Sequence, residues 1–187
     1  MSVQLQRRRF TVAEYYAMAD AGILREDDRV ELIEGEIIQM AAIGSRHAAC
    51  VNRLTRLLVE QAGDAAVVTV QNPARLSDLT EPQPDLTLAR PRADFYAGAH
   101  PRPEDILLLI EVAHSSLGYD REIKLPLYAT AGIPEVWIVD VEGGVVEVYR
   151  DPSGGRFRVA DTARAGDVLS ASKVPAVSFP VARILDG

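Results

Sequence analysis

Residues 105–140 read DILLLIEVAHSSLGYDREIKLPLYATAGIPEVWIVD, and this stretch decides the fold. Residues 105–112 form its most apolar segment, which predicts a central strand covered on both faces. Residues 119–131 have a helical pattern in which Pro126 should kink the helix or divide it. Residues 136–140 predict a second buried strand. A strand, a helix and a strand in this order predict a right-handed βαβ unit with parallel strands.

The segments on either side of this unit are expected to complete a mixed sheet. Further strands are predicted at residues 67–70, continuing at 75–76 after Asn72-Pro73, at 85–89 and at 145–149. We expect these strands to pair antiparallel with their neighbours, and we expect short strands and turns after residue 152. The fold class is therefore α/β, a mixed β-sheet flanked by helices. The chain contains neither G-x-G-x-x-G nor a Walker A motif, so no phosphate-cradling glycine loop is expected.

The N-terminal part is expected to form a helix followed by a hairpin. Thr11 and Glu14 have the spacing of a capping box, which predicts a helix that ends near residue 21. Residues 30–40 are apolar with acidic interruptions and predict a hairpin that turns at Gly35.

A second helix is predicted at residues 46–62. Ser45 is a favourable N-cap, and Gly63 is expected to end the helix. His47 lies on the apolar stripe of this helix. Three arginines lie toward another side and form a modest basic strip, which could contact phosphates or be an ordinary exposed helix face: Arg46, Arg53 and Arg56.

The composition is that of an ordinary globular protein with an acidic balance. The chain has 187 residues, with 20 Lys and Arg against 27 Asp and Glu, and a net charge of −7. This length can bury a complete core, so we expect one domain over residues 1–187, with a flexible tail at 1–9. The acidic balance argues against a general nucleic-acid coat but is compatible with a local basic patch.

The expected compartment is the cytoplasm. The lone Cys50 excludes a disulfide framework and is typical of a reducing environment. The longest apolar run, residues 106–110, is far too short to span a bilayer, and the N-terminus lacks the apolar stretch of a secretory signal. We therefore expect no membrane association.

Three charged residues lie where solvation does not explain them: Asp85 after Pro84, Glu111 at the end of the most apolar strand, and Lys124 in the following helix. If the strands of the two acids are antiparallel neighbours with a register symmetric about residue 98, Asp85 lies directly opposite Glu111 on the same face. Two close carboxylates repel each other, and a divalent cation removes that cost. The pair therefore predicts a Mg²⁺ or Mn²⁺ site for phosphodiester chemistry. Lys124 would orient the attacking water or offset charge on phosphorus.

The same residues resemble the motif of the PD-(D/E)XK nuclease superfamily. The resemblance is carried by Pro84-Asp85, by LIEV at residues 109–112 and by YDREIK at residues 119–124. The usual lysine stands two residues after the second acid, where this chain has Ala113. Lys124 from the next helix offers a migrated substitute.

More closely, the chain resembles the Uma family of restriction-type endonucleases over about residues 10–185. The matching features are ELIEGE at residues 31–36, His47 near the start of a helix, Tyr128-Ala129, and GIPEVWIVD at residues 132–140. The resemblance implies a restriction-endonuclease-like core with an N-terminal helix and hairpin. It also implies a Mg²⁺-dependent nuclease activity on DNA.

Each candidate residue also has a purely structural interpretation. Asp85 could cap a turn, and Glu111 could pair with a buried arginine. Lys124 could pair with Asp120 at the favourable i, i+4 spacing. A lone histidine on an apolar stripe, such as His47, is usually a hydrogen-bonded core residue, although anions bind at helix N-termini.

Further residues are weaker candidates for the same site. Gln71 ends a strand and could point into the same cleft. Glu34, or its neighbour Glu31, could supply a third acid, although alternating acids on a hairpin are typical of a solvated face. Residues 7–9 are three arginines that could contact phosphates or belong to the tail.

The leading interpretation is a metal-dependent endonuclease that hydrolyses DNA phosphodiester bonds. The alternative is a catalytically silent nuclease-fold module that binds nucleic acid or protein, which the net charge of −7 favours because each neutralised phosphate needs a cation. A different phosphate or phosphodiester hydrolase could use the same site. A homodimer is expected because cutting two DNA strands commonly uses two copies of one site.

Overall fold

The strand–helix–strand unit predicted from the sequence lies at the centre of the structure, a computed structural model that describes residues 7–25 and 27–185. β5 (Ile106–Ala113) runs parallel to β6 (Glu135–Asp140), with Leu109 opposite Val136. Every residue of β5 is buried, as expected for a strand covered on both faces. The predicted βαβ unit is confirmed.

The helix between these two strands changes its winding before Pro126. It consists of α3 (Leu117–Tyr119), the π-helical turn η3 (Asp120–Lys124) and α4 (Leu125–Ala131). Proline has no N–H to donate to the preceding turn, and a π turn there removes the conflict. The predicted division of the helix therefore takes the form of one wider turn, which contains Lys124.

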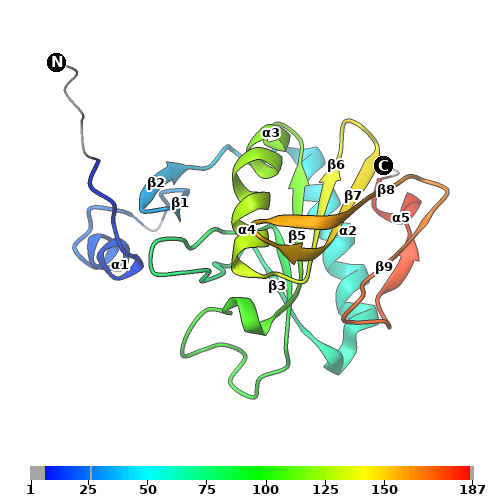
Figure 1. Cartoon of the computed structure of the whole chain (residues 1–187), viewed down its shortest axis with the longest axis horizontal. Helices are drawn as coiled ribbons and strands as arrows, with labels where there is room; N and C mark the ends of the chain where they lie inside the picture. The colour runs from blue at the N-terminus through cyan, green and yellow to red at the C-terminus, as the bar shows by residue number, and fades with distance from the viewer. Residues whose placement is uncertain (1–6, 26, 186–187) are drawn as a thin grey trace.

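The main sheet has six strands in the order β3-β4-β5-β6-β7-β8 (Figure 1). The other four strands are β3 (Val67–Val70), β4 (Leu86–Ala89), β7 (Val145–Ser153) and β8 (Arg156–Ala163). The β5–β6 pair is parallel, and the other four pairs in this sheet are antiparallel. The mixed sheet predicted from the sequence is confirmed.

Helices cover both faces of this sheet (Figure 1). One face packs against α2 (Ser45–Ala62) together with α5 (Ala182–Leu185) and the small sheet of β9 (Val168–Ser170) and β10 (Ser178–Pro180). The other face packs against α4. Side chains of β5 alternate between the two faces, with Leu108 and Ile110 toward α2 and Leu109 toward α4. This alternation turns Glu111 toward α4.

The helix termini agree with the predicted capping signals in part. The capping box of Thr11 and Glu14 is present at the start of α1 (Val12–Asp20). Ser45, however, is the first residue of α2, and Gly44 is the N-cap without a side-chain hydrogen bond. Gly63 ends α2 as predicted, in η1 (Gly63–Ala65), and η2 (Pro103–Asp105) precedes β5. No helix of the described residues, 7–25 and 27–185, is long and apolar enough to cross a membrane.

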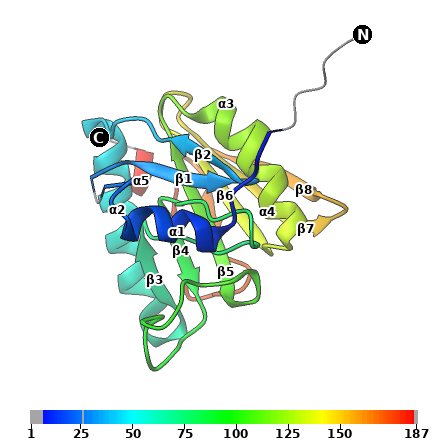
Figure 2. The ribbon, with the colours of Figure 1, turned by 90° about the vertical axis from the view of Figure 1, so that its left-hand side faces the viewer.

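The predicted hairpin is formed by β1 (Val30–Ile33) and β2 (Glu36–Gln39). Figure 2 shows it between α2 and α4, in front of the main sheet. Residues 7–9, expected to belong to a flexible tail, run beside this hairpin. Arg7 pairs with Glu36 at 3.1 Å, and the backbone N–H of Phe10 donates to the carbonyl of Gly35 at 2.8 Å. Residues 1–6 of the expected tail lie outside the described residues.

The strand expected at residues 75–76 is not formed, so this prediction was wrong. Residues 71–85 instead fold back on themselves, with backbone hydrogen bonds from Gln71 to Asp85 at 2.9 Å and from Ala74 to Pro82 at 2.9 Å. This segment contains three prolines, at positions 73, 82 and 84. Since proline donates no backbone hydrogen bond, a regular ladder cannot continue through it.

Candidate active site

The candidate site begins with the register of β4 and β5. Leu86 lies opposite Ile110, and Leu88 lies opposite Leu108. One further step of this ladder places Asp85, just before β4, opposite Glu111. The register predicted from the loop between the two strands is therefore confirmed at this end, and a bulge shifts it only at the far end, between Leu88 and Ala89.

The carboxylate of Asp85 is held by three donors. His47 Nε2 lies 3.0 Å from it, Gln71 Nε2 donates to Oδ1 at 3.2 Å, and the backbone N–H of Val112 donates to Oδ2 at 2.9 Å. His47 comes from the first turn of α2, and Gln71 follows the last residue of β3 with a left-handed φ of 51°. The structure thus brings His47 and Gln71 to Asp85, as the sequence suggested. The other ring nitrogen of His47, Nδ1, is buried and has no partner among the described residues.

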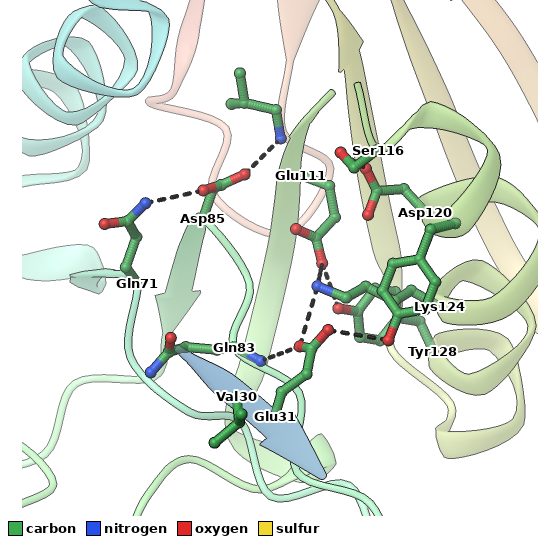
Figure 3. Close-up of polar contacts among 12 residues, drawn as sticks. Val30, Glu31, Gln71, Gln83, Asp85, Glu111, Ser116, Asp120, Lys124 and Tyr128 are labelled. Atoms are coloured by element: carbon green, nitrogen blue, oxygen red, sulfur yellow. Dashed lines mark hydrogen bonds and ion pairs between the residues drawn. The ribbon is translucent and has the colours of Figure 1, made fainter. Parts of the chain in front are cut away.

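Glu111 forms the second half of the site, in contact with the π turn and α4 (Figure 3). Lys124 Nζ lies 3.2 Å from Glu111 Oε1, and the hydroxyl of Tyr128 donates to the same oxygen. Lys124 Nζ also lies 3.2 Å from Glu31 Oε2. One ammonium group is therefore shared between two carboxylates that come from different sheets.

The expected structural alternative for Lys124 was an ion pair with Asp120, and the structure shows other partners instead. Asp120 accepts a hydrogen bond from Ser116 Oγ at 2.7 Å, one turn earlier in the chain. Lys124 is 5% exposed and Asp120 is 3% exposed, so both charged side chains are turned inward. Lys124 is thus directed into the site by long-range contacts rather than by the i, i+4 pairing of its own helix.

Of the two hairpin acids, Glu31 reaches the site. Glu31 is 2% exposed, accepts from the hydroxyl of Tyr119 at 3.0 Å and accepts from the backbone N–H of Gln83 at 2.9 Å. Glu34, the candidate named first from the sequence, is not brought to the site. It is exposed in the turn after β1 with φ 49° and lines a separate cavity. Glu34 therefore lies on a solvated face of the hairpin, as alternating acids usually do, whereas Glu31 is buried in the site.

The electrostatic environment of the site reflects an excess of carboxyl groups. Burial raises the pKa of Glu111 to about 8, with Lys124 opposing the shift and Asp120 and Asp85 adding to it. Burial likewise raises the pKa of Asp120. Burial alone would lower the pKa of Lys124, but Glu111, Glu31 and Asp120 together raise it, so this side chain remains an ammonium group.

These residues line one cavity of about 370 Å³ at the end of the sheet. Its wall includes Asp85, Glu111 and Lys124, and also His47 and Gln71. The chain between β2 and α2 forms another part of the wall. Five of the six candidates from the sequence therefore lie around one space, and Glu34 is the exception.

Sequence reasoning did not assign a role to the two tyrosines of the site. Tyr119 and Tyr128 were noted only as parts of a motif, yet their hydroxyls bond Glu31 and Glu111. The available signal was spacing, because Asp120, Lys124 and Tyr128 recur every four residues and so share one face of the helix. The hairpin sequence carries no comparable signal that separates Glu31 from Glu34.

The donor set fits a hard divalent cation. Asp85 and Glu111 are two carboxylates on the same face of neighbouring strands, and Mg²⁺ takes one or two carboxylates together with waters and phosphate oxygens. Both hydrogen bonds to Glu111 reach Oε1, which leaves Oε2 with no hydrogen bond within the described residues. Over residues 7–25 and 27–185, no group of three or more His, Cys, Asp or Glu side chains is arranged to hold a metal ion.

The architecture, with this site at one end of its sheet, is shared with a protein of known structure. A crystal structure described as that of "a putative nuclease belonging to DUF820" from Anabaena variabilis ATCC 29413 superposes with a TM-score of 0.72 at 16% sequence identity. The match covers 94% of this chain and 97% of that chain. No curated protein matches the chain.

Residues 12–182 match the Uma2 family, described as "Putative restriction endonuclease". The chain belongs to the Uma2 family. The family resemblance and the α/β fold class expected from the sequence are thereby confirmed.

Proposed function

We propose that this protein is a divalent-metal-dependent nuclease that hydrolyses DNA phosphodiester bonds. One observation carries the proposal: Asp85, Glu111 and Lys124 come from three different elements and line the same cavity. In phosphodiester hydrolysis, an acid pair can bind a metal ion and an ammonium group can stabilise developing charge. Membership in a family described as restriction endonucleases supports the same conclusion.

Asp85 and Glu111 would hold the metal ion, Mg²⁺ or Mn²⁺. When bound, such an ion polarises a phosphoryl oxygen and lowers the pKa of a water molecule. His47 and Gln71 fix the orientation of the Asp85 carboxylate through their hydrogen bonds to it. Positioning of this kind keeps a ligand in place without rearrangement during the reaction.

Lys124 would act on the reacting groups directly. Its ammonium group lies 3.2 Å from Glu111 Oε1, so it can donate a hydrogen bond to a water or phosphate oxygen next to that carboxylate. In the reaction the water oxygen forms a bond to phosphorus while one phosphorus–oxygen ester bond breaks. The water loses a proton to solvent, and the leaving alkoxide takes one up from solvent.

The test is cleavage of DNA by the purified protein with Mg²⁺ or Mn²⁺, for the wild type and for Asp85→Asn and Glu111→Gln. Both variants should lose about a hundredfold or more in rate, the size of effect typical for a group that stabilises the transition state. Glu60→Gln is the matched control, because Glu60 is an exposed acid on α2 that pairs only with Arg56 among the described residues. An Asp85→Asn variant that cuts DNA as fast as the wild type would falsify the proposal.

A second candidate function is a nuclease-fold module without catalysis. It is favoured by two arginines of α2 that could have contacted phosphates but are bonded to other groups of this chain. Arg53 Nε donates to the carbonyl of Ile184 at 3.1 Å, and Arg56 pairs with Glu60 at 2.8 Å. Calorimetric titration with Mn²⁺ separates the two functions, since a catalytically silent module has no need to bind the ion.

The homodimer expected from the sequence remains a prediction. Cutting both strands of a duplex at one place would use two copies of the site, whereas cutting a single strand needs one. Sedimentation of the purified chain, with and without DNA, measures which of these states is present.

A further inference from the structure

The acids of the site line a cavity whose wall also includes the chain between β2 and α2. Glu111 is 2% exposed, and Met40 and Ile43 line the cavity as part of the chain that joins β2 to α2. Two hydrogen bonds with Arg29 hold this part of the cavity wall in position. The backbone N–H of Met40 donates to the carbonyl of Arg29 at 2.8 Å, and Arg29 Nη1 donates to the carbonyl of Ala41 at 2.9 Å.

The size of this cavity limits what can reach the acids. Its volume of about 370 Å³ is at the small end of the roughly 300–1,000 Å³ found for small-molecule sites, which suits one nucleotide. In a duplex, each phosphate is part of a stiff rod and is flanked by paired and stacked neighbours. Enzymes that act on a base take it out of the stack and into a pocket. A backbone phosphate lies on the outside of the duplex, so access to this cavity is limited by steric fit: a strand that is free to bend can bring its phosphate into the cavity, whereas a stiff duplex cannot.

Most arginines near the N-terminus and on α2 have partners within this chain, and among the described residues Arg9 and Arg46 are the two without an ion pair or side-chain hydrogen bond. Four arginines near the N-terminus and on α2 are engaged with partners of this chain: Arg7 with Glu36, Arg8 with Glu14, Arg56 with Glu60, and Arg53 with the carbonyl of Ile184. A protein that follows a duplex needs a row of available cations, because each phosphate it neutralises uses one. Two cations, Arg29 and Lys124, line the cavity itself, and they too have partners in this chain: Arg29 donates to the carbonyl of Ala41, and Lys124 pairs with Glu31 and Glu111. Two cations in one cavity can meet at most one or two phosphates.

We propose that the site acts on single-stranded DNA, or on a frayed or flapped end, with one nucleotide entering the cavity, and not on intact duplex. This inference rests on the proposed nuclease function and names its substrate class. The apolar side chains of Met40 and Ile43 contact the sugar or base of that nucleotide. Its phosphate meets Lys124 beside the Asp85 and Glu111 pair.

The experiment compares three fluorescently labelled DNA substrates of one sequence: a single strand, a blunt duplex, and a duplex with a single-stranded flap. Wild-type protein with Mn²⁺ should cut the single strand and the flap about a hundredfold faster than the blunt duplex. At about 1.4 kcal/mol for each factor of ten, this ratio corresponds to about 3 kcal/mol, the order of the cost of unpairing. Asp85→Asn should abolish cutting of all three, which assigns the activity to this site.

A second readout does not depend on cleavage. Fluorescence anisotropy with Ca²⁺ in place of Mn²⁺ measures binding of the single strand over a range of salt concentrations. For one or two phosphate contacts, the logarithm of the binding constant should fall with the logarithm of salt concentration with a slope of about −0.7 to −1.4. A slope near −6 would indicate a long phosphate-contacting surface and would contradict the inference.

The outcomes distinguish this inference from the proposed function. If the blunt duplex is cut as fast as the single strand, and Asp85→Asn abolishes both activities, the substrate class is wrong while the nuclease function stands. If none of the three substrates is cut, both the proposed nuclease function and the proposed substrate class are wrong.

Discussion

The hydrogen bond from Tyr128 to Glu111 provides a direct test of the buried half of the site. Tyr128 is 1% exposed and Glu111 is 2% exposed, so water cannot replace the hydroxyl if it is removed. Burial and the neighbouring Glu111 raise the pKa of Tyr128 well above its usual value, so the hydroxyl stays protonated and donates. At a pH above about 8, the raised pKa of Glu111, its carboxylate is charged. Because a hydrogen bond to a charged group contributes about 1.5–3 kcal/mol, Tyr128→Phe should then lower the free energy of unfolding by about 2 kcal/mol. For a chain of this size, that corresponds to a fall of about 4–8 °C in Tm.

The assay is urea unfolding followed by the fluorescence of the single tryptophan, Trp137, which is fully buried. Tyr149→Phe is the matched control, since the Tyr149 hydroxyl also donates to a carboxylate, Glu147, at 2.9 Å but in a partly buried place. Glu147 keeps its ion pair with Arg121, so the control should lose less than about 1 kcal/mol. Equal effects of the two substitutions, or a loss below about 0.5 kcal/mol for Tyr128→Phe, would refute the reasoning.

Three further predictions concern stability and reactivity. Lys124→Met should destabilise the fold by about 3–5 kcal/mol in urea unfolding, because it leaves two buried carboxylates without their cation; a loss under about 1 kcal/mol would contradict the ion-pair geometry. Burial raises the pKa of the Cys50 thiol to about 11, so a disulfide reagent at pH 8 should label it only after unfolding, and rapid labelling of the native protein would argue against its burial. Gly35→Ala should cost about 1–3 kcal/mol, since φ is +80° and the new Cβ would lie 2.5 Å from Arg9 Cβ; Gly22→Ala, with φ +72° and open space, is the control and should cost less.

The acid pair of Asp85 and Glu111 shows how far sequence reasoning can extend. Residues 90–105 join β4 to β5, and this loop is too long to fix the register by itself. A register symmetric about residue 98 nevertheless places residue 85 opposite residue 111, and the structure agrees at this end of the strands. Two acids at that position could therefore be paired before any coordinates were known. His47 and Gln71 were also placed correctly, because a helix start and a strand end both lead to the same end of the sheet.

The third acid could not be chosen in the same way. Glu31 and Glu34 belong to one small hairpin, and its sequence is consistent with either one facing the main sheet. The choice depends on how the hairpin packs, which is set by the bridge between Leu32 and Glu81 and by the contact of Lys124 with Glu31. These contacts join segments that are far apart in the chain.

By itself, the sequence determined the parallel βαβ centre, the mixed sheet around it and the resemblance to the family, and it suggested the register of the acid pair. The centre and the sheet follow from patterns within about one or two elements, where the apolar period leaves few choices. Only the tertiary structure decided that Lys124 is shared by Glu31 and Glu111 instead of pairing with Asp120, and that the site lies beneath the chain joining β2 to α2. The physical reason is that a buried charge takes the partners that packing brings to it, and those partners come from other segments of the chain.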